Sequence, residues 1–501
     1  MKAKAIHICG TGSGVGKSVV VSALCRIFMQ DGFRVAPFKS QNMALNSYVT
    51  ADGGEMARAQ VVQAQACGIE PTVDMNPILI KPSSDTGAQI IVRGKPVGNM
   101  NVLDYVKYKK NGIGIAKESL DKLLLEYEVV VMEGAGSPAE INLKKHDIVN
   151  IKIAAYAKAP VILVGDIDKG GVFAWIVGTL ELLTKEEKKM VKGIIINKFR
   201  GDITLLKPGI KFLEKYTGIK VLGVIPYFKD IKIPEEDAVP TGSGVRGVNS
   251  KRKINISVIY LPHISNFTDF DALEREDDVI LRYVKRPQEL DGSDMIIIPG
   301  TKNTISDLAY LKKSSFDKKI ASIIKSNNKT MLIGVCGGYQ ILGTKIKDLR
   351  NIESHVKEMS GLGFLPVETA LQKEKMLARV KAKSLFSNAD VSGYEIHHGV
   401  SKTIEESKPA FKIFQSNGKK SKYFDGVITK DKRIFGTYIH GLFESVSFRR
   451  GLLNSVRKRK GWLELPQDEA FNLDDEFDKL AKLIRESLDM KSLYRILKGK
   501  L

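Results

Sequence analysis

Continuous apolar stretches alternate with helical stretches through the first half of this chain. Short runs rich in β-branched residues occur at 5–9, 35–38, 129–132, 161–164, 193–196 and 221–225. Because these runs are apolar at nearly every position, they predict strands buried on both faces, and the helices between them supply the crossovers that parallel strands need. The pattern predicts a parallel α/β sheet whose ligands bind at the carboxyl ends of its strands.

The second half of the chain repeats this alternation after a break. A polar, turn-rich segment at 234–253 reads as a linker, and apolar runs resume at 254–261, 295–298, 331–335 and 434–439. They predict a second α/β unit, followed by a charged stretch of helical period. The expected organisation is given by residue range: a nucleotide domain at 1–235, a linker at 236–252, a second domain at 253–450 and a helical extension at 451–501.

Composition narrows the class of protein. With 501 residues the chain is too long for one core, and its 43% hydrophobic residues are ordinary for a globular protein. No apolar run has membrane-spanning length, no secretory signal opens the chain, and the 4 cysteines lie far apart. We therefore expect a cytoplasmic protein without a membrane partner.

The net charge of +21 favours anionic partners such as nucleotides, polycarboxylates or nucleic acid. The basic residues are spread along the chain instead of forming one tail, which argues against nucleic acid. The sequence leaves open whether the protein forms a homo-oligomer.

A glycine-rich loop lies between the first predicted strand and an amphipathic helix. Glycines let backbone N–H groups turn toward phosphate oxygens, and the helix N-terminus adds positive potential. Lys17 is expected to pair with the phosphates and the Ser18 hydroxyl to ligate Mg²⁺. The strict pattern has glycine where Thr11 stands, so the loop is a variant. The predicted nucleotide-binding residues of this loop are Gly10, Thr11, Gly12, Gly14, Gly16, Lys17 and Ser18.

This loop, together with Glu133-Gly134-Ala135-Gly136 after a predicted strand, resembles the dethiobiotin synthetase-type group of P-loop enzymes, which activate carboxylates. The resemblance implies that Ser18, Asp52 and Glu133 bind Mg²⁺ and that Asn197 recognises adenine. Lys39, at the end of another predicted strand, is expected to hold the γ-phosphate or a substrate carboxylate.

A second centre is predicted around Cys336, in the sequence Gly-Val-Cys-Gly-Gly-Tyr-Gln. An apolar strand that leads through a Gly-Gly turn into a helix is the geometry of a nucleophile elbow, and the helix N-terminus favours a thiolate. The N–H of Gly337 and the loop at Gly300 are the predicted oxyanion donors. His440 is the predicted base and His397 its rival.

The Cys336 segment resembles the class I glutamine amidotransferases, in which a cysteine thiolate releases ammonia from glutamine. Most members of that class carry a glutamate two residues after the histidine. Here that position is Leu442, and Glu444 lies two residues further on. The third member of the triad is therefore either missing or supplied from elsewhere in the chain.

The two halves in this order resemble the cobyric acid synthase/cobyrinic acid diamide synthase group. Five further stretches match the cobyric acid synthase branch: 40–47, 53–60, 166–173, 197–202 and 265–271. The resemblance implies an ATP- and glutamine-dependent amidation of the b, d, e and g carboxylates of adenosylcobyrinic acid a,c-diamide. The implied substrates are a corrinoid polycarboxylate, ATP and glutamine, with Mg²⁺ and no permanently bound cofactor. The expected substrate-binding residues are Gln41, Asn42, Asn46 and Asp166.

Three alternatives remain open from the sequence. The chain could be a cobyrinic acid a,c-diamide synthase-like amidoligase, although that branch carries Gly-Pro-Asp-Tyr where Gln41-Asn42-Met43 stands. It could be a ParA-like ATPase that binds DNA or protein, although the signature lysine of that group is absent from the Gly10-Thr11-Gly12 start. Finally, the second domain could be a non-catalytic scaffold, with free ammonia as the nitrogen source.

Overall fold

The first α/β unit is built on a six-stranded parallel sheet. The computed structural model describes residues 3–82, 87–234, 253–466 and 471–500. The strand order is β12-β11-β10-β1-β9-β2, and all neighbouring pairs are parallel. Each strand coincides with one of the six apolar runs. Their bounds are β1 Lys4–Gly10, β2 Val35–Phe38, β9 Val129–Glu133, β10 Val161–Asp166, β11 Val191–Phe199 and β12 Val221–Pro226.

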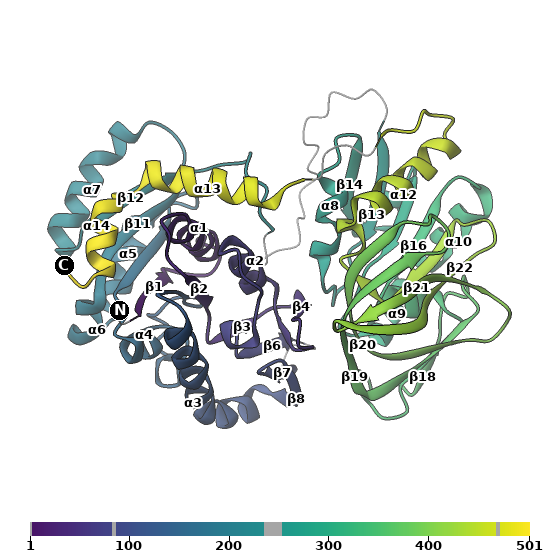
Figure 1. The fold of residues 1–501 in the computed structure, drawn as a ribbon, viewed down its shortest axis with the longest axis horizontal. Helices are drawn as coiled ribbons and strands as arrows, with labels where there is room; N and C mark the ends of the chain where they lie inside the picture. Colours follow the sequence, from purple (N-terminus) through teal and green to yellow (C-terminus); the bar gives the residue numbers. More distant parts are fainter. Residues whose placement is uncertain (1–2, 83–86, 235–252, 467–470, 501) are drawn as a thin grey trace.

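Helices cover both faces of this sheet (Figure 1). Helix α1 packs on one face together with helices from the end of the chain, while α3, α4 and α5 pack on the other. Since both faces are buried, every strand position must be apolar, which explains the continuous runs in the sequence. The helices of this unit are α1 Lys17–Gln30, α2 Arg58–Ala66, α3 Val102–Glu126, α4 Ile151–Ala157, α5 Val172–Glu181, α6 Lys185–Met190 and α7 Ile203–Thr217.

Two small sheets follow β2 and were not predicted from the sequence. A four-stranded sheet has the order β3-β6-β7-β8, and a two-stranded hairpin pairs β4 with β5. These strands are short or carry polar residues, so their apolar signal is weak. Their bounds are β3 Gln41–Met43, β4 Ser47–Val49, β5 Glu55–Ala57, β6 Ile78–Pro82, β7 Gly87–Val92 and β8 Lys95–Asn101.

The second unit joins a parallel sheet to a long antiparallel one. The parallel part has the order β14-β13-β15-β16-β23, and β22, β21 and β19 extend it with antiparallel pairing. The four apolar runs correspond to β13 Ile254–Ile259, β15 Met295–Ile298, β16 Met331–Val335 and β23 Ile434–Thr437. The other strands are β14 Val279–Val284, β17 Lys345–Lys347, β18 Glu358–Ser360, β19 Val367–Ser384, β20 Asp390–Thr403, β21 Lys408–Ser416, β22 Lys419–Ile428 and β24 Ile439–His440.

The helices of the second unit cover its parallel strands and include one that crosses a predicted domain boundary. Helix α12 spans the expected boundary at 450, and its Phe448, Leu452 and Val456 belong to the core of the second unit. The expected linker at 236–252 lies outside the described residues. The helix bounds are α8 Asp271–Glu274, α9 Thr304–Lys313, α10 Phe316–Ser326, α11 Gly337–Leu342 and α12 Val446–Arg459.

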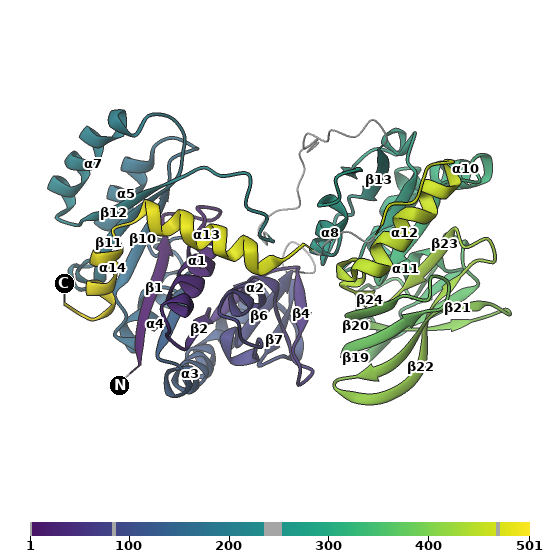
Figure 2. The same cartoon turned by 45° about the horizontal axis from the view of Figure 1, so that its top comes forward.

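The end of the chain returns to the first unit. Helix α13 Leu473–Ser487 lies along α1, as both views show (Figures 1 and 2). Helix α14 Met490–Leu497 follows it and packs near β1 and β12. Phe477, Leu480 and Ile484 are buried in the same core as α1. Arg26 of α1 pairs with Asp474 and Asp478 of α13. The chain thus passes from the first unit to the second and back, so the tail is part of the first core.

Within the described part of the chain, none of the helices combines the length and the apolar character that crossing a bilayer requires.

We expect removal of tail contacts to destabilise the first unit selectively. Leu480 is 0% exposed and Leu463 is 83% exposed. Leu480→Ala should lower the free energy of unfolding by about 2–5 kcal/mol, the range for a buried leucine. Urea unfolding followed by Trp175 fluorescence, in a Trp462→Phe background, measures this change for the first unit.

The matched control is Leu463→Ala, which should change the free energy of unfolding by no more than about 0.5 kcal/mol. Equal effects of the two substitutions would show that α13 is not part of the first core.

Candidate active sites

The phosphate loop connects β1 to α1 and is shaped by contacts that exclude larger residues. Gly16 has a φ of 94°, and a Cβ there would lie 2.2 Å from the Asn197 amide nitrogen. Only glycine both adopts this positive φ readily and leaves room for the Asn197 amide. The Asn197 amide donates to the Val15 carbonyl over 2.9 Å. Asn197, expected to recognise adenine, therefore lies directly against the loop.

Lysine and carboxylate side chains converge on the end of this loop. Lys17 Nζ donates to the carbonyls of Gly12 (2.8 Å) and Gly136 (3.2 Å). Ser18 Oγ donates to Glu133 Oε1 over 2.9 Å, and Lys39 Nζ lies 2.8 Å from the same oxygen. The structure thus gathers the ends of β1, β2 and β9 at one point, as expected for neighbouring parallel strands.

The Glu133 carboxylate is held in its charged form. Burial alone raises the pKa of Glu133, but Lys39, Gln63 and Lys17 outweigh burial and lower that pKa below its ordinary value. Gln63 donates to the second carboxylate oxygen, with a contact of 2.5 Å. A charged carboxylate beside a hydroxyl is a suitable ligand set for a hard cation.

Ser18 and Glu133 fit a Mg²⁺ site, whereas Asp52 lies elsewhere. Asp52 is exposed on the turn between β4 and β5 and accepts a hydrogen bond from Thr50. Its neighbour Gly53 lies against Asn417 and the Leu377 carbonyl of the second unit. No contact among the described residues joins Asp52 to Ser18 or Glu133. The β4–β5 hairpin carries Asp52 to the interface between the units, which the resemblance did not anticipate.

The residues expected to bind substrate occupy two separate places. Asp166, at the end of β10, is buried and pairs with Lys198 Nζ at 2.9 Å, and the same ammonium donates to the Gly14 carbonyl. Asp166 therefore supports the phosphate loop. Asn42 is buried and bonds to Gln60, while Gln41 beside it is partly exposed. Asn46 is buried near the interface between the units.

Cys336 occupies a strained elbow between β16 and α11. Its φ and ψ are 52° and −108°, an unusual conformation for a residue other than glycine. A Cβ at Gly338 would lie 1.9 Å from the Ile298 carbonyl oxygen, so the turn requires glycine after the nucleophile. The thiol reaches the Ile396 carbonyl at 3.4 Å. The predicted nucleophile elbow is therefore present.

His440 has a carboxylate partner that sequence reasoning missed. Its Nδ1 lies 2.6 Å from Asp269 Oδ2, and the other Asp269 oxygen accepts from the Gly441 N–H at 2.9 Å. Asp269 lies in the stretch 265–271 that was noted only as a resemblance, and it precedes Cys336 in the chain. Glu444 instead lies 3.6 Å from Arg275. Asp269 thus occupies the third position of a Cys-His-Asp arrangement.

Electrostatics favour a charged imidazole here. Burial lowers the pKa of His440, but the Asp269 carboxylate and the nearby Cys336 thiol raise that pKa to about 10. Burial lowers the pKa of the rival His397 to about 4, and His397 stacks on Tyr438 at 3.7 Å between ring centroids. The geometry therefore favours His440 as the partner of Cys336.

The predicted oxyanion loop is adjacent to the elbow. A Cβ at Gly337 would meet Thr301 at 2.6 Å, and one at Gly300 would lie 3.2 Å from the His440 ring. Gly300 therefore lies beside the His440 ring, and Gly337 lies beside Thr301.

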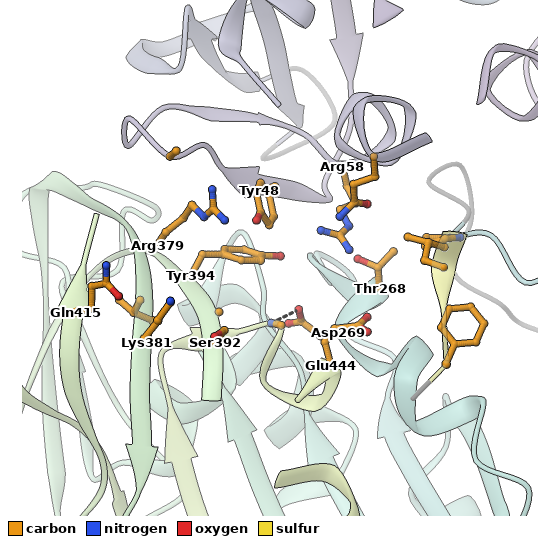
Figure 3. Close-up of a pocket in the computed structure, with 18 of the residues that line it drawn as sticks. Tyr48, Arg58, Thr268, Asp269, Arg379, Lys381, Ser392, Tyr394, Gln415 and Glu444 are labelled. Atoms are coloured by element: carbon orange, nitrogen blue, oxygen red, sulfur yellow. Dashed lines mark hydrogen bonds between the residues drawn. The ribbon is translucent and has the colours of Figure 1, made fainter. Parts of the chain in front are cut away.

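The two units close over the Cys336 site. A cavity of about 30 Å³ is lined by Cys336, His440, Lys302 and Lys375 of the second unit and by Lys81 of the first. A larger cavity of about 550 Å³ lies on the other side of His440, where Figure 3 shows Tyr48, Arg58 and Arg379 above Tyr394. The nitrogen-releasing centre is therefore enclosed at the boundary between the units.

A buried ion cluster holds this boundary together. Glu55 of β5 pairs with Lys81 at 3.0 Å and with Lys375 of β19 at 2.6 Å. Burial raises the pKa of Glu55, but the two ammonium groups outweigh burial and hold that pKa well below its usual range. Burial lowers the pKa of Lys375 to about 7 despite the nearby carboxylate. Removal of Glu55 would leave the buried lysines without their counter-charge, which costs about 3–5 kcal/mol.

Comparisons with known proteins match a family model to each unit. Residues 6–240 match the CobQ/CobB/MinD/ParA nucleotide binding domain, and residues 255–448 match the CobB/CobQ-like glutamine amidotransferase domain. These matches and the α/β fold define a glutamine amidotransferase-type ligase with a nucleotide-binding domain.

Full-length relatives identify the family. Cobyric acid synthase of Clostridium botulinum (strain Loch Maree / Type A3) is 51% identical over 98% of this chain and 99% of that protein. The cobyric acid synthases of Clostridium novyi (strain NT) and Dehalococcoides mccartyi (strain CBDB1) are each 48% identical over 99% of this chain, and 98% and 99% of those proteins are covered. The chain belongs to the cobyric acid synthase family and catalyses glutamine-dependent amidation in cobalamin biosynthesis, using ATP.

The relatives decide between the alternatives that the sequence left open. Their similarity spans both units, so the predicted family and reaction class are confirmed over a ParA-like ATPase. They also favour the cobyric acid synthase branch over the diamide synthase branch.

We expect Asp269→Asn to impair glutamine hydrolysis and to leave amidation with ammonium chloride unchanged. The change removes the main charge that raises the pKa of His440. Glutamate release should fall by roughly 10²–10⁴-fold, the usual contribution of a positioned acid–base group. The alkaline limb of its pH profile should move to lower pH, because the imidazolium then loses its proton more easily.

Glu444→Gln is the matched control, since Glu444 stands near the position that the class usually reserves for the acid. It should retain glutamate release near the parent level. A larger loss in Glu444→Gln than in Asp269→Asn would contradict the assignment.

We expect Glu133→Gln to impair ATP-dependent amidation and to spare glutamine hydrolysis. ATP-dependent amidation should fall by roughly 10²–10³-fold with either glutamine or ammonium chloride, because one preorganised charge is lost at the phosphate site. Glutamate release at Cys336 should persist. Steady-state rates of ADP and glutamate formation measure the two activities, and Glu128→Gln, at the exposed start of the same segment, is the control.

Proposed function

We propose that the chain converts adenosylcobyrinic acid a,c-diamide into adenosylcobyric acid by amidating its b, d, e and g side-chain carboxylates. The proposal is supported by two dissimilar centres in one chain, a phosphate loop with Lys39 and Glu133 and an enclosed Cys336-His440-Asp269 arrangement. The phosphate-loop centre suits activation of a carboxylate, and the Cys336 centre suits release of the nitrogen that this carboxylate receives.

In the second unit, the Cys336 thiolate attacks the side-chain amide carbon of glutamine. The N–H groups of Gly337 and of the Gly300 loop stabilise the oxyanion, and His440 gives its proton to the departing nitrogen. The C–N bond breaks and leaves ammonia and a glutamyl thioester. Water then hydrolyses the thioester, which restores the thiol and releases glutamate.

In the first unit, a corrinoid carboxylate oxygen attacks the γ-phosphorus of ATP, and ADP leaves. Backbone N–H groups of the loop and Lys17 bind the phosphates, and Lys39 holds the γ-phosphate or the attacking carboxylate. Ammonia attacks the acyl carbon of the resulting acyl phosphate and inorganic phosphate departs. Gln41, Asn42 and Asp166 are proposed to support substrate binding, and Asn197 to recognise adenine. Asn46 is left out of the substrate contacts because only 1% of it is exposed.

Ser18 and Glu133 are the residues proposed to hold Mg²⁺, which supplies charge neutralisation at the transferring phosphoryl group. Asp52 is not included, since its hairpin directs it to the other unit. The net charge of +21 favours approach of a polyanionic corrinoid. We further propose a cytoplasmic enzyme that does not use nucleic acid as a partner.

The central experiment is incubation with ATP, Mg²⁺, glutamine and the a,c-diamide, followed by mass spectrometry. Glutamine labelled with ¹⁵N in its side-chain amide should place label in the b, d, e and g amides in succession. A product in which other positions are amidated, or in which amidation stops after one, would contradict the proposed substrate.

Cys336→Ala should abolish amidation with glutamine and retain it with ammonium chloride. The thiol releases nitrogen and takes no part in the phosphate chemistry. Cys67→Ala, at a buried cysteine outside both centres, is the control and should retain both activities. If Cys336→Ala lost amidation equally with glutamine and with ammonium chloride, Cys336 could not be assigned to nitrogen release alone.

A further inference from the structure

The chamber at Cys336 is large enough for the product that must leave it. Its volume of about 30 Å³ exceeds the roughly 10–15 Å³ that one water molecule needs, and ammonia is of similar size. Lys81, Lys302 and Lys375 line this chamber. Burial lowers the pKa of Lys302 and lowers the pKa of Lys375 to about 7. The same desolvation disfavours ammonium, so nitrogen there stays as neutral, nucleophilic ammonia.

A series of buried polar contacts leads from the chamber into the first unit. The Asn266 amide nitrogen lies 3.3 Å from His440 Nδ1, and its amide oxygen accepts from the Ser47 N–H at 2.9 Å. The Ser47 hydroxyl donates to Glu55 over 3.0 Å. All these groups are buried, so the series crosses the boundary between the units without contact with solvent.

A second series of buried amides ends at the phosphate site. The Asn42 amide donates to Gln60 at 3.1 Å, Gln60 donates to Gln63 at 3.4 Å, and Gln63 donates to Glu133. Glu133 is also bonded to Ser18 of the phosphate loop. This second series reaches the place where the acyl phosphate forms in the proposed reaction.

Asn46 adjoins both series through its backbone. It precedes Ser47 in the chain, and its carbonyl accepts from the Arg58 N–H at 3.2 Å, at the first residue of the helix that carries Gln60 and Gln63. Asn46 is 1% exposed, yet neither its amide nitrogen nor its amide oxygen has a hydrogen-bond partner. An unsatisfied buried polar group costs about 1–3 kcal/mol, so a carboxamide kept in this state points to a transient ligand.

From this arrangement we infer that Asn46 is the relay through which ammonia passes from the Cys336 chamber to the acyl phosphate. Its amide oxygen accepts an N–H of ammonia, and its amide nitrogen donates to the ammonia lone pair. The inference rests on the proposed function, and it assigns the passage between the two centres to a particular side chain.

The larger cavity is separated from this path by aromatic side chains and by α2. Tyr394 stacks on His440 at 5.4 Å and Tyr48 packs against Tyr394 at 5.0 Å, so these rings stand between His440 and the cavity of Figure 3. Gln65 lines that cavity. Helical geometry puts Gln60 and Gln63 on the opposite face of α2 from Gln65.

The test is the yield of corrinoid amide per glutamate released, measured with ¹⁵N-amide glutamine in the presence of unlabelled ammonium chloride. Asn46→Leu replaces the carboxamide with an apolar group of similar size. It should retain glutamate release, retain amidation by ammonium chloride, lower the amide-to-glutamate ratio at least fivefold and release ¹⁵N-ammonium into solution. An unchanged ratio would overturn the inference.

Gln65→Met is the matched control, because the Gln65 amide oxygen is also buried without a partner but lines the larger cavity. It should keep the parent ratio, and an equal fall in Gln65→Met would overturn the assignment to Asn46. If Asn46→Leu also weakens ammonium-driven amidation, Asn46→Asp, which preserves volume and lacks the Nδ2 donor, must still lower the ratio. If the amide-to-glutamate ratio of Asn46→Asp equals that of the parent protein, the inference is overturned.

Failure of the proposed function gives a different result. In that case the parent protein forms no amide from the a,c-diamide with either nitrogen source, and the Asn46 variants are not the cause. If only the inference fails, the parent and the Asn46 variants form amide from glutamine with equal yield.

Discussion

The pairing of Glu55 with Lys81 and Lys375 connects the two units at their boundary and helps to close the Cys336 chamber. Charges buried this deeply are stable only while each retains its partner. Lys375 lies on β19 of the second unit, and Glu55 lies on the β4–β5 hairpin of the first. Separation of the units would therefore remove Lys375 from its carboxylate partner, whereas Glu55 would keep Lys81. This constraint keeps a centre that releases ammonia in contact with one that uses it.

Each centre controls charge in a manner suited to its chemistry. At the phosphate loop, Lys39 and Lys17 keep Glu133 ionised despite burial, so a metal-binding carboxylate is ready before nucleotide arrives. At the second centre, Asp269 keeps His440 protonated beside the thiol. Between the centres the buried groups are mostly uncharged amides, which can bond to ammonia without converting it into an ion.

The tail adds a second mechanical link between the units. Helix α12 belongs to the second core, whereas α13 and α14 complete the first core against α1. The chain therefore crosses the boundary twice, and Arg26 anchors the return through two aspartates. Such pairs at a partly exposed surface contribute little individually, so buried Phe477 and Leu480 carry most of the attachment.

The sequence by itself determined the six strands of the first sheet, four parallel strands of the second, the phosphate loop and the nucleophile elbow. These features depend on local pattern: runs apolar at every position predict buried parallel strands, and glycines at strict spacing permit the turns at Gly16 and Cys336. The same reasoning located Glu133, Lys39 and His440, because the carboxyl ends of parallel strands meet at one edge. It did not locate the short polar strands β3 to β5, which lack an apolar signal.

Only the tertiary structure decided which distant residues complete each centre. Asp269 lies 171 positions before His440 in the chain, so no spacing rule connects them, although the stretch 265–271 stood out as a resemblance. The displacement of Asp52, the contact of Glu55 with Lys375 and the unpartnered amide of Asn46 all arise from the packing of one unit against the other. Local sequence specifies backbone turns and buried faces, whereas pairing across a boundary depends on how two finished surfaces meet.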